Sequence, residues 1–149
     1  MGVSGAGCVV TIDPIDDGGD GGGDPGSQDG TVTIRVVNNT TTGLDPEIYL
    51  ADGPVSESEL FDDSRKFVEF GVFGLGVIDA LSSDSITVTC EQARMVGTKG
   101  GTFGETVQDP QGTGTKRVLA QELQFNCGDR ITFIYSRAGD GFETTFEVD

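Results

Sequence analysis

The sequence predicts an all-β fold, a single antiparallel β-sandwich preceded by an acidic N-terminal tether without fixed structure. From Thr31 onward, apolar and polar residues alternate in short runs that are separated by turn-forming clusters. About eight such runs at close spacing are typical of a β-sandwich. The 149 residues are enough for one domain.

The chain divides into a leader with a flexible tether, residues 1–30, and a sandwich domain, residues 31–149. The first part contains ten glycines and six aspartates but no Lys or Arg. Such a composition is typical of a solvated linker, because it offers almost no apolar surface to bury.

Within the leader, residues 9–15 form a short β-branched run that ends at Asp13-Pro14. One interpretation is a spare strand that pairs with the open sheet edge of a neighbouring copy. Its contact residues would be Val9, Val10 and Ile12. The alternative is an unstructured spacer.

In the first half of the domain, Val32, Ile34 and Val36 predict a strand that ends in the polar cluster 38–43. That cluster contains two overlapping matches to the N-glycosylation sequon, one at Asn38 and one at Asn39.

A second strand is predicted over residues 47–51, closed by Asp52-Gly53-Pro54. Ser56 and Glu59 form a capping box, which predicts one or two helical turns through Asp63. The most apolar stretch, residues 65–78, predicts a buried strand interrupted by glycines.

In the second half, residues 82–84 predict a turn, and the strand that follows places Ile86, Val88 and Cys90 on one face. Residues 97–114 are rich in glycine and predict a loop that carries Phe103. Five alternate residues then predict one apolar strand face: Leu119, Gln121, Leu123, Phe125 and Cys127. A hairpin closes the chain, with its turn at residues 138–141.

Cys90 and Cys127 each fall on the apolar face of a predicted strand, where two facing sheets can be joined through the core. We expect a disulfide, which would contribute roughly 3 to 4 kcal/mol in the chain-entropy model; the alternative is two buried free thiols. A disulfide would place the domain outside the cytoplasm. The arrangement resembles the inter-sheet bridge of immunoglobulin-type domains, which implies a similar sandwich architecture but no particular binding site.

The residues Gly5-Ala6-Gly7-Cys8, followed by a polar tether and a β-rich domain, resemble the processing site of a bacterial lipoprotein. This resemblance implies that Cys8 is the lipid attachment point. The alternative is a loose thiol on a frayed terminus.

Charge and composition argue against several classes of function. The formal net charge is −16, which would repel nucleic-acid phosphates and an anionic membrane surface. The chain has no His, so it lacks the usual general base near neutral pH and the usual imidazole metal ligand. We expect no enzymatic activity, no cofactor and no metal site.

Two functional hypotheses remain. The first is an extracytoplasmic, non-catalytic module with a binding or structural role, secreted or anchored to the cell envelope, whose partner would be a protein or a cell-surface component. Its contact loop would be residues 97–114 with Phe103, unless Phe103 is a core residue under that loop. The second is a fibre or appendage subunit that polymerises with other copies by donating the strand 9–15.

Overall fold

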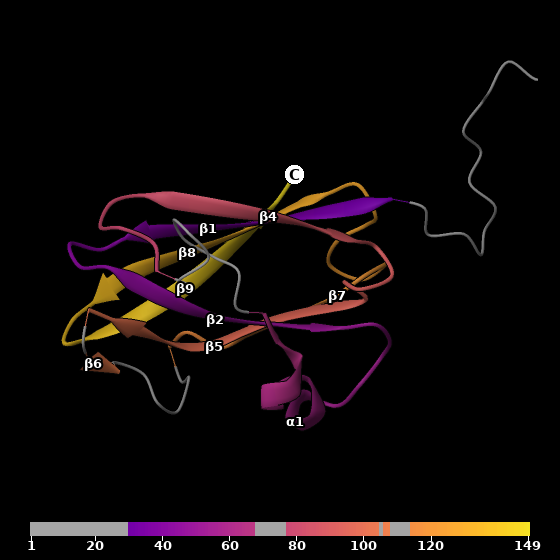
Figure 1. Ribbon diagram of the computed structural model, residues 1–149, viewed down its shortest axis with the longest axis horizontal. Helices are drawn as coiled ribbons and strands as arrows, with labels where there is room; N and C mark the ends of the chain where they lie inside the picture. The colour runs from indigo at the N-terminus through magenta and orange to yellow at the C-terminus, as the bar shows by residue number, and fades with distance from the viewer. Residues whose placement is uncertain (1–29, 68–76, 105, 108–113) are drawn as a thin grey trace, which may run out of the picture.

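Two β-sheets pack face to face in the computed structural model, which describes residues 30–67, 77–104, 106–107 and 114–149 (Figure 1). The first sheet, sheet A, has the strand order β4 (Ser83–Thr89), β1 (Thr31–Asn39), β8 (Arg130–Ala138) and β9 (Gly141–Val148). The second, sheet B, has the order β3 (Lys66–Phe67), β2 (Leu44–Ala51), β5 (Met95–Phe103) and β6 (Thr106–Val107), and β7 (Arg117–Ala120) also pairs with β5. The predicted all-β class is confirmed, and its strands form two sheets that pack together.

The first strand, β1, lies inside sheet A and follows the predicted alternation. Val32, Ile34 and Val36 are fully buried, whereas Thr31 and Arg35 are exposed. Its pairing with β4 is antiparallel, but its pairing with β8 is parallel. The expectation of a purely antiparallel sandwich is therefore wrong for the β1–β8 pair.

The C-terminal hairpin is confirmed. β8 and β9 pair antiparallel over their whole lengths, and Ala138 lies opposite Gly141 at the turn. Gly139 has a positive φ of 58°, a conformation that glycine adopts without strain.

The predicted loop over residues 97–114 is wrong in its first part, because Met95–Phe103 is the strand β5 in the interior of sheet B. Its glycine at position 97 is needed for packing: an added Cβ would lie 2.8 Å from Leu60 Cδ2 and 3.1 Å from Phe61 Cε1. Here glycine marks a close approach of another segment to the strand rather than a loop.

That neighbouring segment is the short helix α1 (Glu57–Leu60), which packs on the outer face of sheet B. The predicted capping box is confirmed, because Ser56 Oγ accepts from the Glu59 N–H at 3.3 Å and the Ser56 N–H donates to Glu59 Oε2 at 2.9 Å. A 3₁₀ turn, η1 (Asp63–Arg65), then leads into β3.

Two further local expectations need correction. Ser83 and Asp84 belong to β4, so the chain reverses just before residues 82–84 rather than within them. Of the buried strand predicted over residues 65–78, the structure describes β3 and a single bridge between Ile78 and Leu44; residues 68–76 lie outside the described part.

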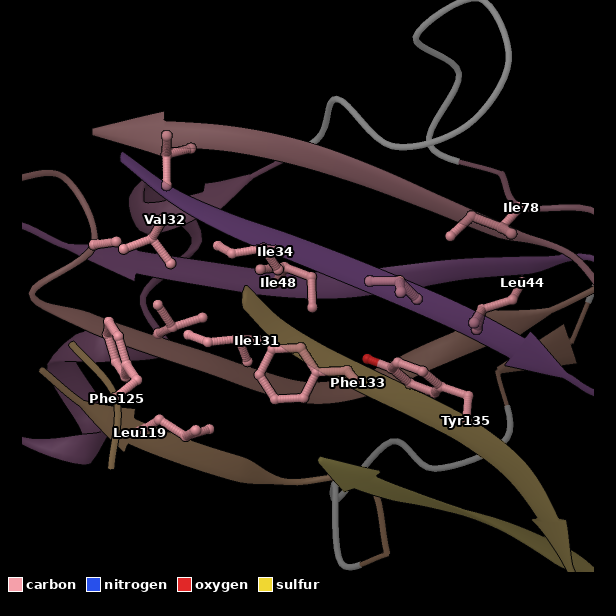
Figure 2. Packing of buried hydrophobic residues seen from close by; sticks show 14 of the residues in the cluster. Val32, Ile34, Leu44, Ile48, Ile78, Leu119, Phe125, Ile131, Phe133 and Tyr135 are labelled. Carbon is pink, nitrogen blue, oxygen red and sulfur yellow. The ribbon is translucent and has the colours of Figure 1, made fainter. Parts of the chain in front are cut away.

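The main core fills the space between the two sheets (Figure 2). Figure 2 shows Phe133 and Tyr135 of β8 pointing into the same interior as Ile48 of β2. Tyr135 is fully buried, and its hydroxyl is satisfied by a hydrogen bond to Thr98 Oγ1 of the opposite sheet. A smaller cluster on the outside of sheet B joins α1 to Tyr49 and Ala51.

Candidate functional site

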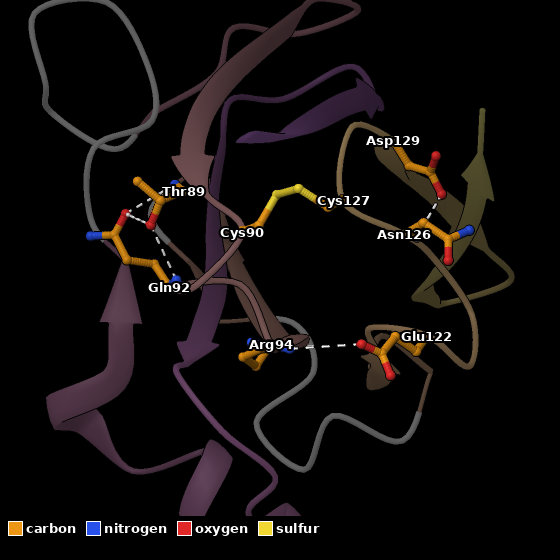
Figure 3. Close-up of a disulfide and its surroundings, with 8 residues drawn as sticks. All are labelled: Thr89, Cys90, Gln92, Arg94, Glu122, Asn126, Cys127 and Asp129. Atoms are coloured by element: carbon orange, nitrogen blue, oxygen red, sulfur yellow. Dashed lines mark hydrogen bonds and ion pairs between the residues drawn. A yellow bond between two sulfur atoms is a disulfide. The ribbon is translucent and has the colours of Figure 1, made fainter. Parts of the chain in front are cut away.

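Cys90 and Cys127 form a disulfide, with their Cα atoms 5.5 Å apart (Figure 3). Each lies in a turn that is fixed by a side chain. Thr89 donates its N–H to Gln92 Oε1 at 3.1 Å, and Asn126 donates its N–H to Asp129 Oδ2 at 2.6 Å. These local bonds hold both cysteines in position for the bridge.

The disulfide lies across the start of β1 rather than between the two sheets. Cys90 follows β4 and Cys127 precedes β8, and these two strands flank β1 in sheet A. The Cys90 N–H donates to the Gly30 carbonyl at 2.9 Å, and the Gly128 N–H donates to the Thr31 carbonyl at 3.0 Å. The bridge therefore joins the two neighbours of β1 at the point where the chain enters the domain.

Gly30 makes this crossing sterically feasible. A Cβ added at Gly30 would collide with Cys127 Sγ and would lie 3.2 Å from Cys90 Sγ. Only a residue without a side chain fits between the first strand and the disulfide.

The predicted environment of Cys127 is wrong. Cys90 is fully buried, but Cys127 is exposed and belongs to no strand. β7 ends at Ala120, and the chain turns so that Phe125 is buried while Leu123 is 80% exposed. The apolar alternation over residues 119–127 thus covers a turn that closes one end of the core, not a single strand face.

Of the predicted contact residues, the structure describes Phe103 alone. Phe103 is 4% exposed and stacks on Phe142, with ring centroids 3.6 Å apart, so it is a core residue and not a surface contact. The predicted lipid site, Cys8, and the contact residues Val9, Val10 and Ile12 lie outside the described residues, as does most of the segment 105–113.

The end of the sandwich opposite Gly30 carries turns that are stabilised by hydrogen bonds from a buried side chain. We call it the distal end; its described turns are residues 40–43, 77–82 and 138–141. The fully buried Asn38 side chain organises the first two, because its Nδ2 donates to the carbonyls of Thr42 at 2.7 Å, Ile78 at 3.1 Å and Asp79 at 3.0 Å. Its Oδ1 accepts from Thr40 N–H at 3.1 Å and Thr40 Oγ1 at 2.6 Å.

Two large apolar residues are exposed in these distal turns. Leu81 is 70% exposed and Val77 is 45% exposed. Leu81 also has a φ of 55°, a conformation that costs a non-glycine residue about 1 kcal/mol or more. An open hollow of about 400 Å³ is lined by Leu81 together with Arg35 and Asn39 of β1. Sequence reasoning missed this surface, because its residues come from separate segments.

A polar group of side chains occupies the outer face of sheet B. Glu47 accepts from Lys66 Nζ at 3.0 Å and from the Tyr49 hydroxyl at 3.2 Å. Burial, and secondarily the Glu47 charge, raise the pKa of Tyr49 to about 12. Burial also raises the pKa of Asp45, although nearby Lys66 partly offsets this. The Glu47 carboxylate thus links Lys66 of β3 to Tyr49 of β2.

Within residues 30–67, 77–104, 106–107 and 114–149, no group of three or more His, Cys, Asp or Glu residues is arranged to hold a metal ion. No helix in that same part of the chain is long and apolar enough to span a bilayer. Comparison with known protein families, with curated proteins and with solved structures finds no match.

Proposed function

We propose that this protein is an extracytoplasmic, non-catalytic β-sandwich module of immunoglobulin-like architecture, secreted or held to the cell envelope through its N-terminal tether. Cys8 would be its lipid attachment point, and its partner would be a protein or a cell-surface component. The observation that carries this proposal is the disulfide across the start of β1 at Gly30.

A bond in this position reinforces the domain where a tether would pull on it. Tension applied through residues 1–29 would reach the domain at Gly30 and act on β1. Because β4 and β8 are covalently joined across this strand, they cannot separate to release it. A disulfide of this kind also persists in oxidising compartments outside the cytoplasm.

A protein attached through its N-terminus would present the distal end to a partner. β1 runs from Gly30 toward Asn39, so the exposed residues Leu81 and Val77 lie at the far end of the sandwich from the attachment point. Loops on a rigid scaffold commonly carry binding functions. We therefore assign partner contact to the distal turns in place of Phe103.

Mass spectrometry of the protein taken from its native compartment tests this proposal. We expect Cys90 and Cys127 to be oxidised and Cys8 to carry a lipid, and we expect a Cys8→Ser variant to move from the membrane fraction to the soluble fraction. A secreted form would instead show the disulfide with an unmodified Cys8. Free thiols at positions 90 and 127 in freshly isolated protein would contradict an extracytoplasmic location.

One observation favours the alternative, a subunit that polymerises by donating the strand 9–15. β9 is an edge strand, and Arg130 and Asp149 exchange two backbone hydrogen bonds at 2.7 and 3.1 Å. Because antiparallel bonds alternate, the backbone groups of Phe146 and Val148 face the open edge. Neither has a backbone partner there within the described residues, and Phe146 is 42% exposed.

The opposite edge of sheet A is better protected. On β4, the outward N–H groups of Ser85 and Thr89 are occupied by Asp84 Oδ1 at 2.8 Å and Gln92 Oε1 at 3.1 Å. Side chains that cover an edge in this way oppose pairing with another chain. On β9 the outward N–H of Thr144 is taken by the Gly114 carbonyl at 3.1 Å, so an incoming strand would be accepted at Phe146 and Val148.

Sedimentation of the full chain at high concentration separates the two functions. A polymerising subunit should form assemblies that disappear on deletion of residues 1–29 and on Phe146→Lys substitution. A Glu91→Lys variant is the matched control, because it makes the charge change in the same direction at an exposed residue outside both edges. A purely monomeric full chain would exclude strand donation and leave the tethered module.

A further inference from the structure

We propose that Asn39 is an N-glycan acceptor and that the overlapping sequon at Asn38 is not used in the folded protein. The acceptor sequences Asn38-Asn39-Thr40 and Asn39-Thr40-Thr41 share two of their three residues. The structure separates them by the direction in which each asparagine points.

The period of the strand sets these directions. Both asparagines end β1, in which the residues at even positions are buried and those at odd positions face outward. Asn38 continues the inward series of Val32, Ile34 and Val36, and Asn39 continues the outward series.

Asn38 cannot carry a sugar without loss of the distal turn. Its side chain is fully buried, and its Nδ2 already donates to the carbonyls of Thr42, Ile78 and Asp79. A glycan on this nitrogen would replace one of its hydrogens and would have to occupy the core. Its sequon threonine, Thr40, is also buried, at 4% exposed.

Asn39 has the opposite environment. It is exposed on the outer face of sheet A, and within the described part of the chain its Nδ2 makes one long contact, 3.5 Å to Ser136 Oγ. Its sequon threonine, Thr41, is exposed as well. The open hollow of about 400 Å³ that Asn39 lines with Arg35 and Ser83 leaves room beside the amide for a first saccharide.

The chemistry is a group transfer from a lipid-linked oligosaccharide. The amide nitrogen of Asn39 attacks the anomeric carbon, an N–C bond forms, and the bond from that carbon to the lipid phosphate oxygen breaks. The amide loses one proton, and the lipid phosphate leaves with the electron pair. No oxidant or reductant is needed. Transfer of this kind takes place outside the cytoplasm, so the inference rests on the location given under the proposed function.

The test is expression of the full chain, directed by a cleavable secretion signal, in a eukaryotic host with an oligosaccharyltransferase, followed by peptide mass spectrometry and enzymatic deglycosylation. We expect the secreted, disulfide-bonded protein to carry glycan on Asn39 and none on Asn38. Asn39→Gln and Thr41→Ala should each abolish the change in electrophoretic mobility that deglycosylation causes. Thr41→Ser keeps an acceptor sequence and should retain that change.

Thr41→Ala is the decisive variant, because it removes the acceptor sequence of Asn39 and leaves that of Asn38 intact. Glycan on Asn38 in folded Thr41→Ala protein would overturn the proposal, as would wild-type protein that is secreted without any glycan. The oxidation state of Cys90 and Cys127 distinguishes failure of the acceptor site from failure of the proposed extracytoplasmic function. Secreted protein with an intact disulfide and no glycan contradicts only the acceptor site. Protein whose cysteines remain reduced after secretion would argue against the proposed function.

Discussion

The two ends of the sandwich are closed in different ways. At the end where β1 begins, the Cys90–Cys127 disulfide joins the turns next to β4 and β8 across this strand, and Gly30 allows the crossing. At the distal end, one buried amide, Asn38, holds two turns through hydrogen bonds to their carbonyls. The covalent closure lies at the start of β1, and the polar closure supports the turns that carry the exposed residues Leu81 and Val77.

If the disulfide stabilises the fold more than the Asn38 hydrogen bonds do, its removal should cause the largest loss in the free energy of unfolding. The Cys90→Ala/Cys127→Ala double variant should lose about 4 kcal/mol of unfolding free energy, because the denatured chain regains the freedom of a 37-residue loop. Urea denaturation measures this loss, and thiol reduction of the wild-type protein should reproduce it. A loss below about 1 kcal/mol would mean that the disulfide constrains little.

At the distal end, Asn38→Ala should lower the free energy of unfolding by about 2 to 3 kcal/mol, because it leaves the buried Ile78 carbonyl and the part-buried carbonyls of Thr42 and Asp79 without their donor. Its neighbour Asn39 is the matched control: Asn39→Ala should change the free energy of unfolding by less than about 0.5 kcal/mol, since the side chain is exposed. Equal effects of the two substitutions in urea denaturation would contradict the assigned directions of these side chains.

The steric role of Gly30 should appear only when the disulfide is present. Gly30→Ala should destabilise the oxidised protein by about 1 to 3 kcal/mol through overpacking. The same substitution should be close to neutral in the Cys90→Ala/Cys127→Ala background. Gly53→Ala is the control, because a Cβ there has no neighbour within 4 Å. If Gly30→Ala destabilises the protein equally with and without the disulfide, glycine is required there by the backbone conformation and not by contact with the cysteine sulfurs.

The smallest effect is spectroscopic and reports on the distal end. The chain has two tyrosines, and burial raises the pKa of both: Tyr49 to about 12, and Tyr135 further. Because these folded-state pKa values exceed the unfolded value of about 10, the associated stability is present below pH 10 and is lost as the pH rises through the folded pKa. Absorbance at 295 nm should therefore change little up to about pH 11.

Tyr135 lies opposite Asn38 in the β1–β8 register, so opening the distal end should affect it first. In Asn38→Ala, part of the tyrosinate absorbance should appear nearer pH 10, whereas the Gly30→Ala variant should keep the wild-type profile while it stays folded. Identical shifts in both variants would show that the two ends do not respond separately.

The sequence by itself determined the elements that depend on local pattern. The alternation in β1 and in the β8–β9 hairpin predicted strands that the structure contains, and the Ser56–Glu59 capping box predicted the start of α1. It also predicted which two cysteines pair. Such features follow from backbone geometry over a few residues, which the side chains in the same segment largely specify.

Only the tertiary structure decided which segments meet. Nothing local in the glycine-rich run at 97–103 indicates a central strand, because its need for glycine comes from Leu60 and Phe61 packing above Gly97. Likewise, the exposed position of Cys127 follows from a turn that buries Phe125 instead. Close approach between distant segments depends on the whole arrangement of the sheets, and for this reason the sequence predicted the disulfide at Cys90 and Cys127 but not its course across Gly30.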